Sequence, residues 1–143
     1  MLTLNQVIKS LNDIADSHLQ INSFQYDSLP NIASSGTIYY PMMFVVVQPS
    51  SVSTKKLNLN LSLIFCDLVH KGETNIQEVE SDQLSIALDI INKLQSPTYG
   101  WSFDTESPRL VPFRDRFDDE VTGWTCNIVL GLPKDIDRCS IPT

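Results

Sequence analysis

The stretch from Lys55 to Val69, KKLNLNLSLIFCDLV, decides the fold of this chain. Its large apolar side chains fall on every second position, at Leu57, Leu59, Leu61, Leu63 and Phe65. The positions between them begin as Asn58, Asn60 and Ser62 and continue as Ile64, Cys66 and Leu68. Side chains alternate between the two faces of a strand, whereas a helix would scatter these leucines around its circumference. The stretch therefore predicts a long strand with one buried face. Its other face is polar in the first half, and its apolar second half needs cover from the chain or from a neighbouring subunit.

Length and composition favour one folded domain. The chain has 143 residues, of which 42% are hydrophobic and 19% are charged. Its net charge of -7 is unfavourable for gripping nucleic acid, because phosphates are bound by basic surfaces. No apolar run approaches the roughly 20 residues that cross a bilayer, and no signal-peptide pattern opens the chain. We expect a single α+β domain over residues 1–133 and a C-terminal tail or arm over residues 134–143.

Two segments have apolar residues at helical spacing. Residues 3–19 predict an amphipathic helix, which Thr3 and Gln6 begin as a capping box. The second helix is expected to start at Ser81 as its N-cap and to end at Ser96-Pro97. Both helices would bury one face against a sheet.

The remaining patterns predict strands and loops. A weak strand is expected over residues 20–26, a loop over 27–37 and a central apolar strand over 42–47. The 42–47 strand and the Leu57 strand are close enough in sequence to form a hairpin. Short strands are expected near residues 101–103 and 110–113, and a second clean alternation covers residues 124–132. This order predicts two helices on one face of a mainly antiparallel sheet that contains both alternating strands.

The chain has none of the common catalytic motifs, whether a phosphate-binding glycine loop, a nucleophile elbow or a metalloprotease helix. Cys66, Cys126 and Cys139 are odd in number and widely spaced, which argues against a disulfide framework or a zinc site. Cys66 and Cys126 lie in strand patterns and are expected in the core. His70 at a strand end is more typical of a surface loop than of a general base. We therefore expect no catalytic residue, no cofactor and no bound metal.

The most charged stretch is RDRFDDE, residues 114–120. Its charged residues are Arg114, Asp115, Arg116, Asp118, Asp119 and Glu120. Three interpretations fit it: a solvated hairpin or loop, a contact between subunits in which arginines meet a neighbour's acids, or a divalent-cation site. The spacing is not that of an EF-hand loop. The six residues are candidates for a subunit interface or for the surface of a channel.

The segment RFDDEVTGWTCNIVLGLP, residues 116–133, resembles the small tail-completion and tail-terminator proteins of tailed bacteriophages. Asp115, Asp118, Gly123 and Trp124 stand before an alternating strand, as at the start of the C-terminal strand of such proteins. The order of elements from residue 3 to 133, including the segment YYPMMFVVV, is also similar. The resemblance implies a virion protein, assembled in the host cytoplasm, that forms a six- or twelve-fold homo-oligomeric ring beside portal, connector or tail proteins. DNA would pass through the ring without being read, and no membrane would be involved.

Two other functions fit the residues. A small adaptor could bind a peptide or small ligand near Trp101, Phe103 and Trp124, where aromatic side chains gather. An enzyme could use His70 with a carboxylate from the stretch 115–120. The structural virion protein, which needs no catalysis, is the leading hypothesis.

The alternation yields a direct mutational test. Leu61→Asp is expected to unfold the domain, because it places an unpaired charge on the buried face. Asn60→Asp should change stability little if its face meets water. Circular dichroism and chemical denaturation of both variants measure this contrast. If the Asn60→Asp variant folds but no longer assembles, the face of the strand that carries Asn60 is an interface between subunits.

Overall fold

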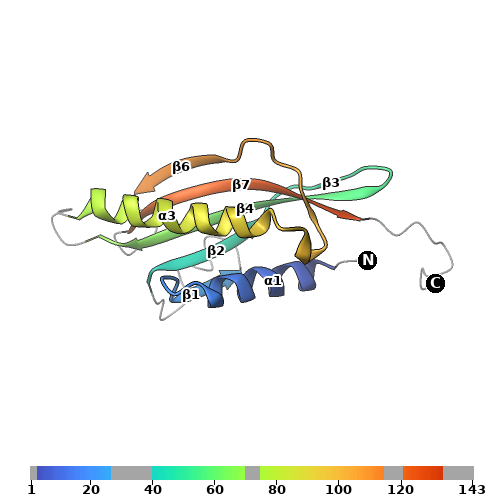
Figure 1. Cartoon of the computed structure of the whole chain (residues 1–143). Helices are drawn as coiled ribbons and strands as arrows, with labels where there is room; N and C mark the ends of the chain where they lie inside the picture. Colours follow the sequence, from blue (N-terminus) through green and yellow to red (C-terminus); the bar gives the residue numbers. More distant parts are fainter. Residues whose placement is uncertain (1–2, 27–39, 70–74, 115–120, 134–143) are drawn as a thin grey trace.

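The computed structural model describes residues 3–26, 40–69, 75–114 and 121–133. In chain order its elements are helix α1 (Leu4–Ser17), strands β1 (Ser23–Tyr26), β2 (Met42–Val47), β3 (Ser51–Val52) and β4 (Lys56–Leu68), helix α3 (Ile76–Leu94), the 3-10 turn η1 (Pro97–Tyr99), and strands β5 (Ser102–Phe103), β6 (Arg109–Arg114) and β7 (Val121–Pro133). Both α-helices lie on the same face of a seven-stranded mixed sheet (Figure 1). This arrangement confirms the predicted α+β class. The predicted loop 27–37 and tail 134–143 lie outside the described residues.

The sheet is built around β4 and β7. These two strands are antiparallel and pair along their whole length, from Lys56 opposite Pro133 to Leu68 opposite Val121. β2 lies on the other side of β4 in the predicted hairpin, and β1 continues the sheet parallel to β2. β3 pairs with β4 beyond the end of β2, while β5 and β6 both pair with β7 at different levels. The sheet is thus mainly antiparallel, as predicted, with β1 as its parallel strand.

The main core lies between the sheet and the two helices. The leucine face of β4 points into it, and Leu61, Leu63 and Phe65 are fully buried there. Val7 and Leu11 of α1 and Ile86, Ile90 and Leu94 of α3 cover these side chains. The core forms because the alternation of β4 meets the apolar stripes of both helices.

A smaller apolar cluster fills the opposite face of the sheet at one end. Ile64 and Cys66 of β4 pack there with Met42, Phe44 and Val121, and all five are buried. The apolar second half of the β4 outer face is therefore covered within a single chain up to Cys66. Cys126 is also buried, in the main core, which confirms the expectation for both cysteines, and burial raises the pKa of its thiol to about 11.

Helix α1 begins as the sequence predicts. Thr3 is its N-cap, the Thr3 hydroxyl accepts from the Gln6 N–H, and the Gln6 side chain accepts from the Thr3 N–H at 2.8 Å. The predicted start of the second helix at Ser81 is wrong, since α3 begins at Ile76 after Asn75. The additional turn is held by tertiary contacts, because Val79 is buried and the Glu80 carbonyl accepts from Nε1 of Trp124 in β7.

The start of β7 also differs from the prediction. The strand begins at Val121, three residues before the predicted start at Trp124, so Gly123 lies within it. No helix in the described part of the chain is long and apolar enough to cross a membrane.

Gly123 lies at a close approach of two backbones. A methyl group built on it would come within 1.8 Å of the Phe65 carbonyl oxygen and 2.8 Å of the Cys66 Cα. Backbone atoms of a central strand cannot move aside as a flexible side chain can. A residue without a side chain is therefore required where β7 meets β4.

Gly123→Ala is expected to lower the free energy of unfolding by at least 2–3 kcal/mol, roughly the cost of a severe overpacking. Gly100→Ala is the matched control, because its added methyl meets no atom within 4 Å and carries only the strain of a positive φ of 85°, about 1 kcal/mol. Urea denaturation of both variants gives the two values. Equal losses of unfolding free energy in the two variants would show that the added methyl at residue 123 avoids the Phe65 carbonyl without an energetic cost.

Candidate functional site

The charged residues predicted as a site are only partly described. Arg114 is the last residue of β6, and its backbone lies opposite Thr122 of β7. Asp115, Arg116, Asp118, Asp119 and Glu120 lie outside the described residues, as does His70. Their proposed contact with a neighbour stays a prediction. Among the described residues, no group of three or more His, Cys, Asp or Glu side chains could hold a metal ion.

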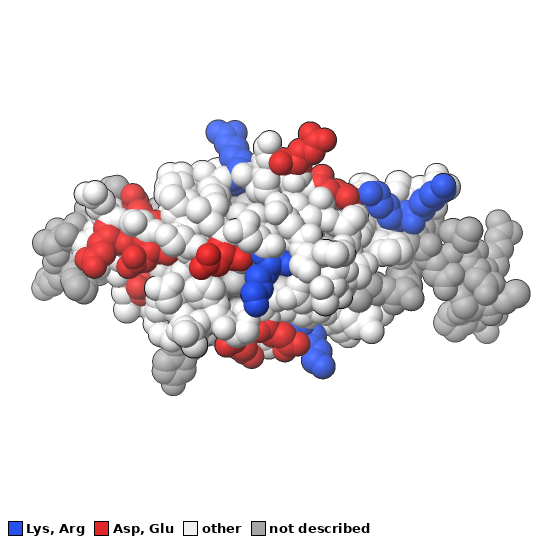
Figure 2. All heavy atoms as spheres, viewed as in Figure 1, with Lys and Arg blue, Asp and Glu red and all other residues white. Residues whose placement is uncertain are grey.

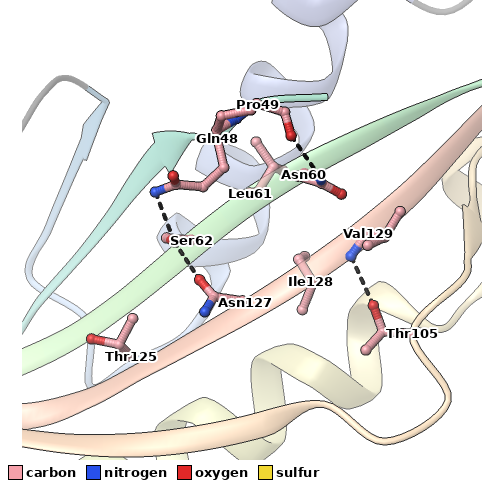
Figure 3. Close-up of a pocket in the computed structure, with 10 residues that line it drawn as sticks. All are labelled: Gln48, Pro49, Asn60, Leu61, Ser62, Thr105, Thr125, Asn127, Ile128 and Val129. Carbon is pink, nitrogen blue, oxygen red and sulfur yellow. Dashed lines mark hydrogen bonds between the residues drawn. The ribbon is translucent and has the colours of Figure 1, made fainter. Parts of the chain in front are cut away.

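A different feature stands out on the face of the sheet that points away from the helices, which we call the outer face. A hollow of about 560 Å³ opens there over the middle of β4 and β7 (Figure 3). We call it the outer-face hollow. Six polar residues line it: Gln48, Asn60, Ser62, Thr105, Thr125 and Asn127. Such a volume lies within the range of small-molecule and peptide pockets.

The first side of the hollow is formed where the strand beside β4 is interrupted. β2 ends at Val47 and β3 begins at Ser51, with Pro49 between them. Proline has no N–H to give to the ladder, so regular pairing stops there. Side chains replace the missing bonds: the Asn60 amide donates to the Pro49 carbonyl at 2.6 Å, and the Asn60 N–H donates to the Ser50 hydroxyl at 3.0 Å.

The second side is formed by a similar interruption beside β7. β5 ends at Phe103, and β6 begins at Arg109. The Asp104 N–H still donates to the Val129 carbonyl, but the Val129 N–H donates to the Thr105 hydroxyl at 2.7 Å and not to a backbone carbonyl. Asn60 and Val129 are direct partners in the β4–β7 ladder. Both flanking strands therefore leave the sheet at the same level, and the hollow lies between the two breaks.

A row of neutral hydrogen bonds crosses the floor of the hollow. Gln48 donates from Nε2 to the Ser62 hydroxyl at 3.1 Å, and that hydroxyl donates to Oδ1 of Asn127 (Figure 3). Ser62 and Asn127 face each other in the β4–β7 register. Because the Ser62 hydroxyl joins the two amides, it fixes their orientation. Oε1 of Gln48 then remains as an acceptor, and Nδ2 of Asn127 remains as a donor.

The chemistry of the hollow suits binding better than catalysis. None of the described residues that line it is charged, and its amides and hydroxyls do not exchange protons with a substrate near neutral pH. The acceptor of Gln48 and the donor of Asn127 match the N–H and C=O groups of an amide. The hollow is therefore suited to a neutral polar group such as a peptide backbone.

Two of the three aromatic residues of the adaptor hypothesis make structural contacts, and one of them, Trp124, also lines a hollow with Pro112 and Phe113. Trp101 is buried, and its Nε1 donates to the Leu94 carbonyl at 3.0 Å, so it closes the end of α3. Trp124 donates from Nε1 to the Glu80 carbonyl at 2.9 Å and ties β7 to the first half of α3. Neither lines the outer-face hollow. His18 likewise connects the helices, because its Nδ1 accepts from the Gln20 N–H and its Nε2 donates to Asp89 at 3.0 Å.

The sequence indicated some of the residues that line the hollow, but not the others. Asn60 and Ser62 interrupt the apolar character of the outer face of β4, and Thr125 and Asn127 do the same on β7. Both strands were predicted to share a sheet, but their register was not, so the Ser62–Asn127 pair was missed. Gln48 and Thr105 lie in connections without a periodic pattern, and no sequence signal indicated them.

An ion pair beside the hollow stabilises the segment after β5, which forms the second side of the hollow. Lys56 Nζ lies 2.9 Å from Oδ2 of Asp104, and the Ser102 hydroxyl donates to Oδ1 at 2.9 Å. The hydrogen bond from Lys56 is the main reason why the pKa of Asp104 is lowered, with a smaller contribution from Ser102 and a partial opposition from desolvation. The pair joins the start of β4 to the segment that follows β5.

No protein-family model matches this chain, and no curated protein matches it. The fold and the geometry of the site therefore carry the argument about function.

The lowered pKa of Asp104 predicts a pH-dependent stability. A carboxyl with a lower pKa in the folded than in the unfolded chain stabilises above the unfolded pKa, about 3.9, and this stabilisation disappears as the pH falls through the folded pKa. Asp104→Asn should therefore lose up to about 1 kcal/mol at pH 7, the range of exposed ion pairs, and nothing at the acid limit. Denaturation from pH 7 down to pH 2 tests this, with Glu106→Gln as control. A loss that is constant with pH would contradict it.

Proposed function

We propose that this chain is a non-enzymatic structural protein of a tailed-phage virion. It would be one subunit of a homo-oligomeric ring at the head–tail connector or at the tail terminus, through which DNA passes. Two features support the proposal: the resemblance of the segment 116–133 and YYPMMFVVV to tail-completion proteins, and the order of helices and strands that this resemblance implies.

The main observation in favour of ring assembly is the separation of charge along the molecule. At one end, Lys55 lies in the turn between β3 and β4, near Val52, which is 66% exposed, and Lys56, which pairs with Asp104, begins β4. At the other end, the first half of α3 carries Glu78, Glu80 and Asp82. Figure 2 shows acidic side chains gathered over the first half of α3 and basic side chains at the opposite end of the same view.

The two ends are too far apart to meet within one chain. β4 runs from the basic turn towards the end of the molecule where α3 begins (Figure 1). A strand of 13 residues spans about 40 Å. Complementary charges at opposite ends of a rigid sheet can be brought together only by a second copy, in a head-to-tail contact. Repeated head-to-tail contacts generate a closed ring when the rotation between neighbours is right.

The net charge of -7 is compatible with such a ring. An acidic channel repels phosphates, so DNA can slide through without being held. Neighbouring portal, connector or tail proteins would occupy the two open sides of the ring.

Two measurements test the proposal. Light scattering after size exclusion reports the oligomer, and mass spectrometry of purified phage particles reports whether the chain is part of them. A ring in solution or a stoichiometric presence in particles supports the proposal. A chain that is monomeric at high concentration and absent from particles contradicts it.

The charge argument predicts a specific pair of variants. Lys55→Glu should weaken assembly by placing like charges at the contact, and Glu78→Lys in the same chain should restore it. Lys9→Glu, on an exposed position of α1, is the matched control with the same charge change. Sedimentation velocity measures all three. Unchanged assembly of the Lys55→Glu variant would show that the basic turn is not part of the contact between subunits.

A second candidate function is favoured by the outer-face hollow. Its neutral lining and its amide donor and acceptor suit a small adaptor that binds a peptide or a polar ligand without catalysis. A stoichiometric thermal shift with such a ligand, in a chain that does not assemble, would favour the adaptor over the ring.

A further inference from the structure

A second cavity, of about 260 Å³, lies where the end of α1, the start of β2, the end of β4 and the first half of α3 meet. We call it the helix-end pocket. The residues that matter in it are Leu19, Asn22, Asp67, Asp82 and Gln83. It is separate from the outer-face hollow, which shares none of its lining residues.

Gln83 is the unusual residue of this pocket. It is only 1% exposed, yet neither its Nε2 nor its Oε1 has a hydrogen-bond partner among the described residues. Buried amides are almost always paired, since an unpaired buried donor or acceptor is costly. Leucine would fill the same position on the buried face of α3 without that cost. The polar side chain is therefore explained by a partner that supplies one acceptor and one donor.

The charge of the pocket specifies a further property of that partner. Asp82 and Asp67 line it, and none of the described residues that line it is a lysine or an arginine. The Asp67 carboxylate accepts from the Leu68 N–H at 2.7 Å and has a further interaction, whereas Asp82 has no ion pair with any described residue. Asn22 is held in place because it bonds the carbonyls of Tyr40 and Pro41, so it forms a fixed wall. A cation is favoured in this setting.

The required groups occur together in one chemical unit. A guanidinium or ammonium side chain brings donors only and would leave Nε2 of Gln83 without an acceptor. The amino terminus of a peptide carries an ammonium group followed by a C=O and an N–H. The ammonium can meet Asp82, the C=O can accept from Nε2 of Gln83, and the N–H can donate to Oε1.

The rim of the pocket indicates a peptide with an apolar first residue. Leu19 is 98% exposed at this rim, directly after the end of α1. An apolar side chain on the first residue of the ligand would pack against it and remove it from water. The small volume admits one or two residues and no more.

We propose that the helix-end pocket binds the amino terminus of a peptide or protein chain, through the ammonium group and the first peptide unit. This activity does not depend on ring assembly. It would allow the protein to hold the processed or native amino terminus of a partner.

The test uses dipeptide amides with the full-length protein. Leu-Ala-amide is expected to bind at millimolar concentration in calorimetry and to shift the side-chain amide signals of Gln83 in NMR spectra. N-acetyl-Leu-Ala-amide, which lacks the cation, should not bind. Gly-Ala-amide should bind more weakly than Leu-Ala-amide, and Leu19→Ser should abolish that difference. Binding of the acetylated probe as tight as that of the free one, or unshifted Gln83 signals as expected for an amide that holds only water, would overturn the proposal.

Variants separate the pocket from general charge attraction. Asp82→Asn should raise the dissociation constant about tenfold, whereas Asp13→Asn, the same charge change on an exposed position of α1 outside the pocket, should leave it nearly unchanged. Gln83→Leu should abolish binding and raise the melting temperature, because it removes an unpaired amide. If Asp13→Asn weakens binding as much as Asp82→Asn does, the pocket is not the site.

Discussion

The antiparallel pairing of β4 with β7 is the contact on which the rest of the structure depends. The two strands, each of 13 residues, pair residue for residue along their whole length. Their inner faces form the floor of the main core, so both helices lie on a surface that this pairing creates. The pairing in turn requires Gly123, because the backbone of β4 leaves no space for a side chain at that point. Register and core are thus fixed together, since a shift by one residue would turn every leucine of β4 to the outer face.

The shorter strands give the molecule its functional surfaces. They pair with β4 and β7 only in pieces, and both outer neighbours break at the level of the Asn60–Val129 pair. In place of regular ladder bonds, the Asn60 side chain donates to the Pro49 carbonyl on one side, and the Val129 N–H donates to the Thr105 hydroxyl on the other. The central strands continue past these breaks, which leaves a hollow with an exposed polar floor. The same long strands hold the basic turn and the acidic start of α3 apart at opposite ends of the molecule.

Three surfaces therefore differ in their chemistry. The outer-face hollow is neutral and offers amide groups, the helix-end pocket is acidic and contains an unpaired amide, and the two ends of the molecule carry opposite charges. The proposed ring subunit would use such distinct surfaces for distinct partners. Specific recognition depends on this difference, because a surface of the wrong charge or hydrogen-bonding pattern rejects a partner.

The sequence by itself determined the elements with a strong periodic pattern. The alternation of β4 and β7, the capping box at Thr3 and the apolar stripes of both helices follow from local side-chain spacing, so the α+β class could be predicted. It did not determine where α3 starts, where β7 starts or how β4 and β7 are registered. Those features depend on contacts between residues far apart in the chain, such as Val79 against the sheet and Ser62 against Asn127. The hollow and the helix-end pocket arise from the same long-range contacts, because each is lined by segments that only the packed sheet and helices bring together.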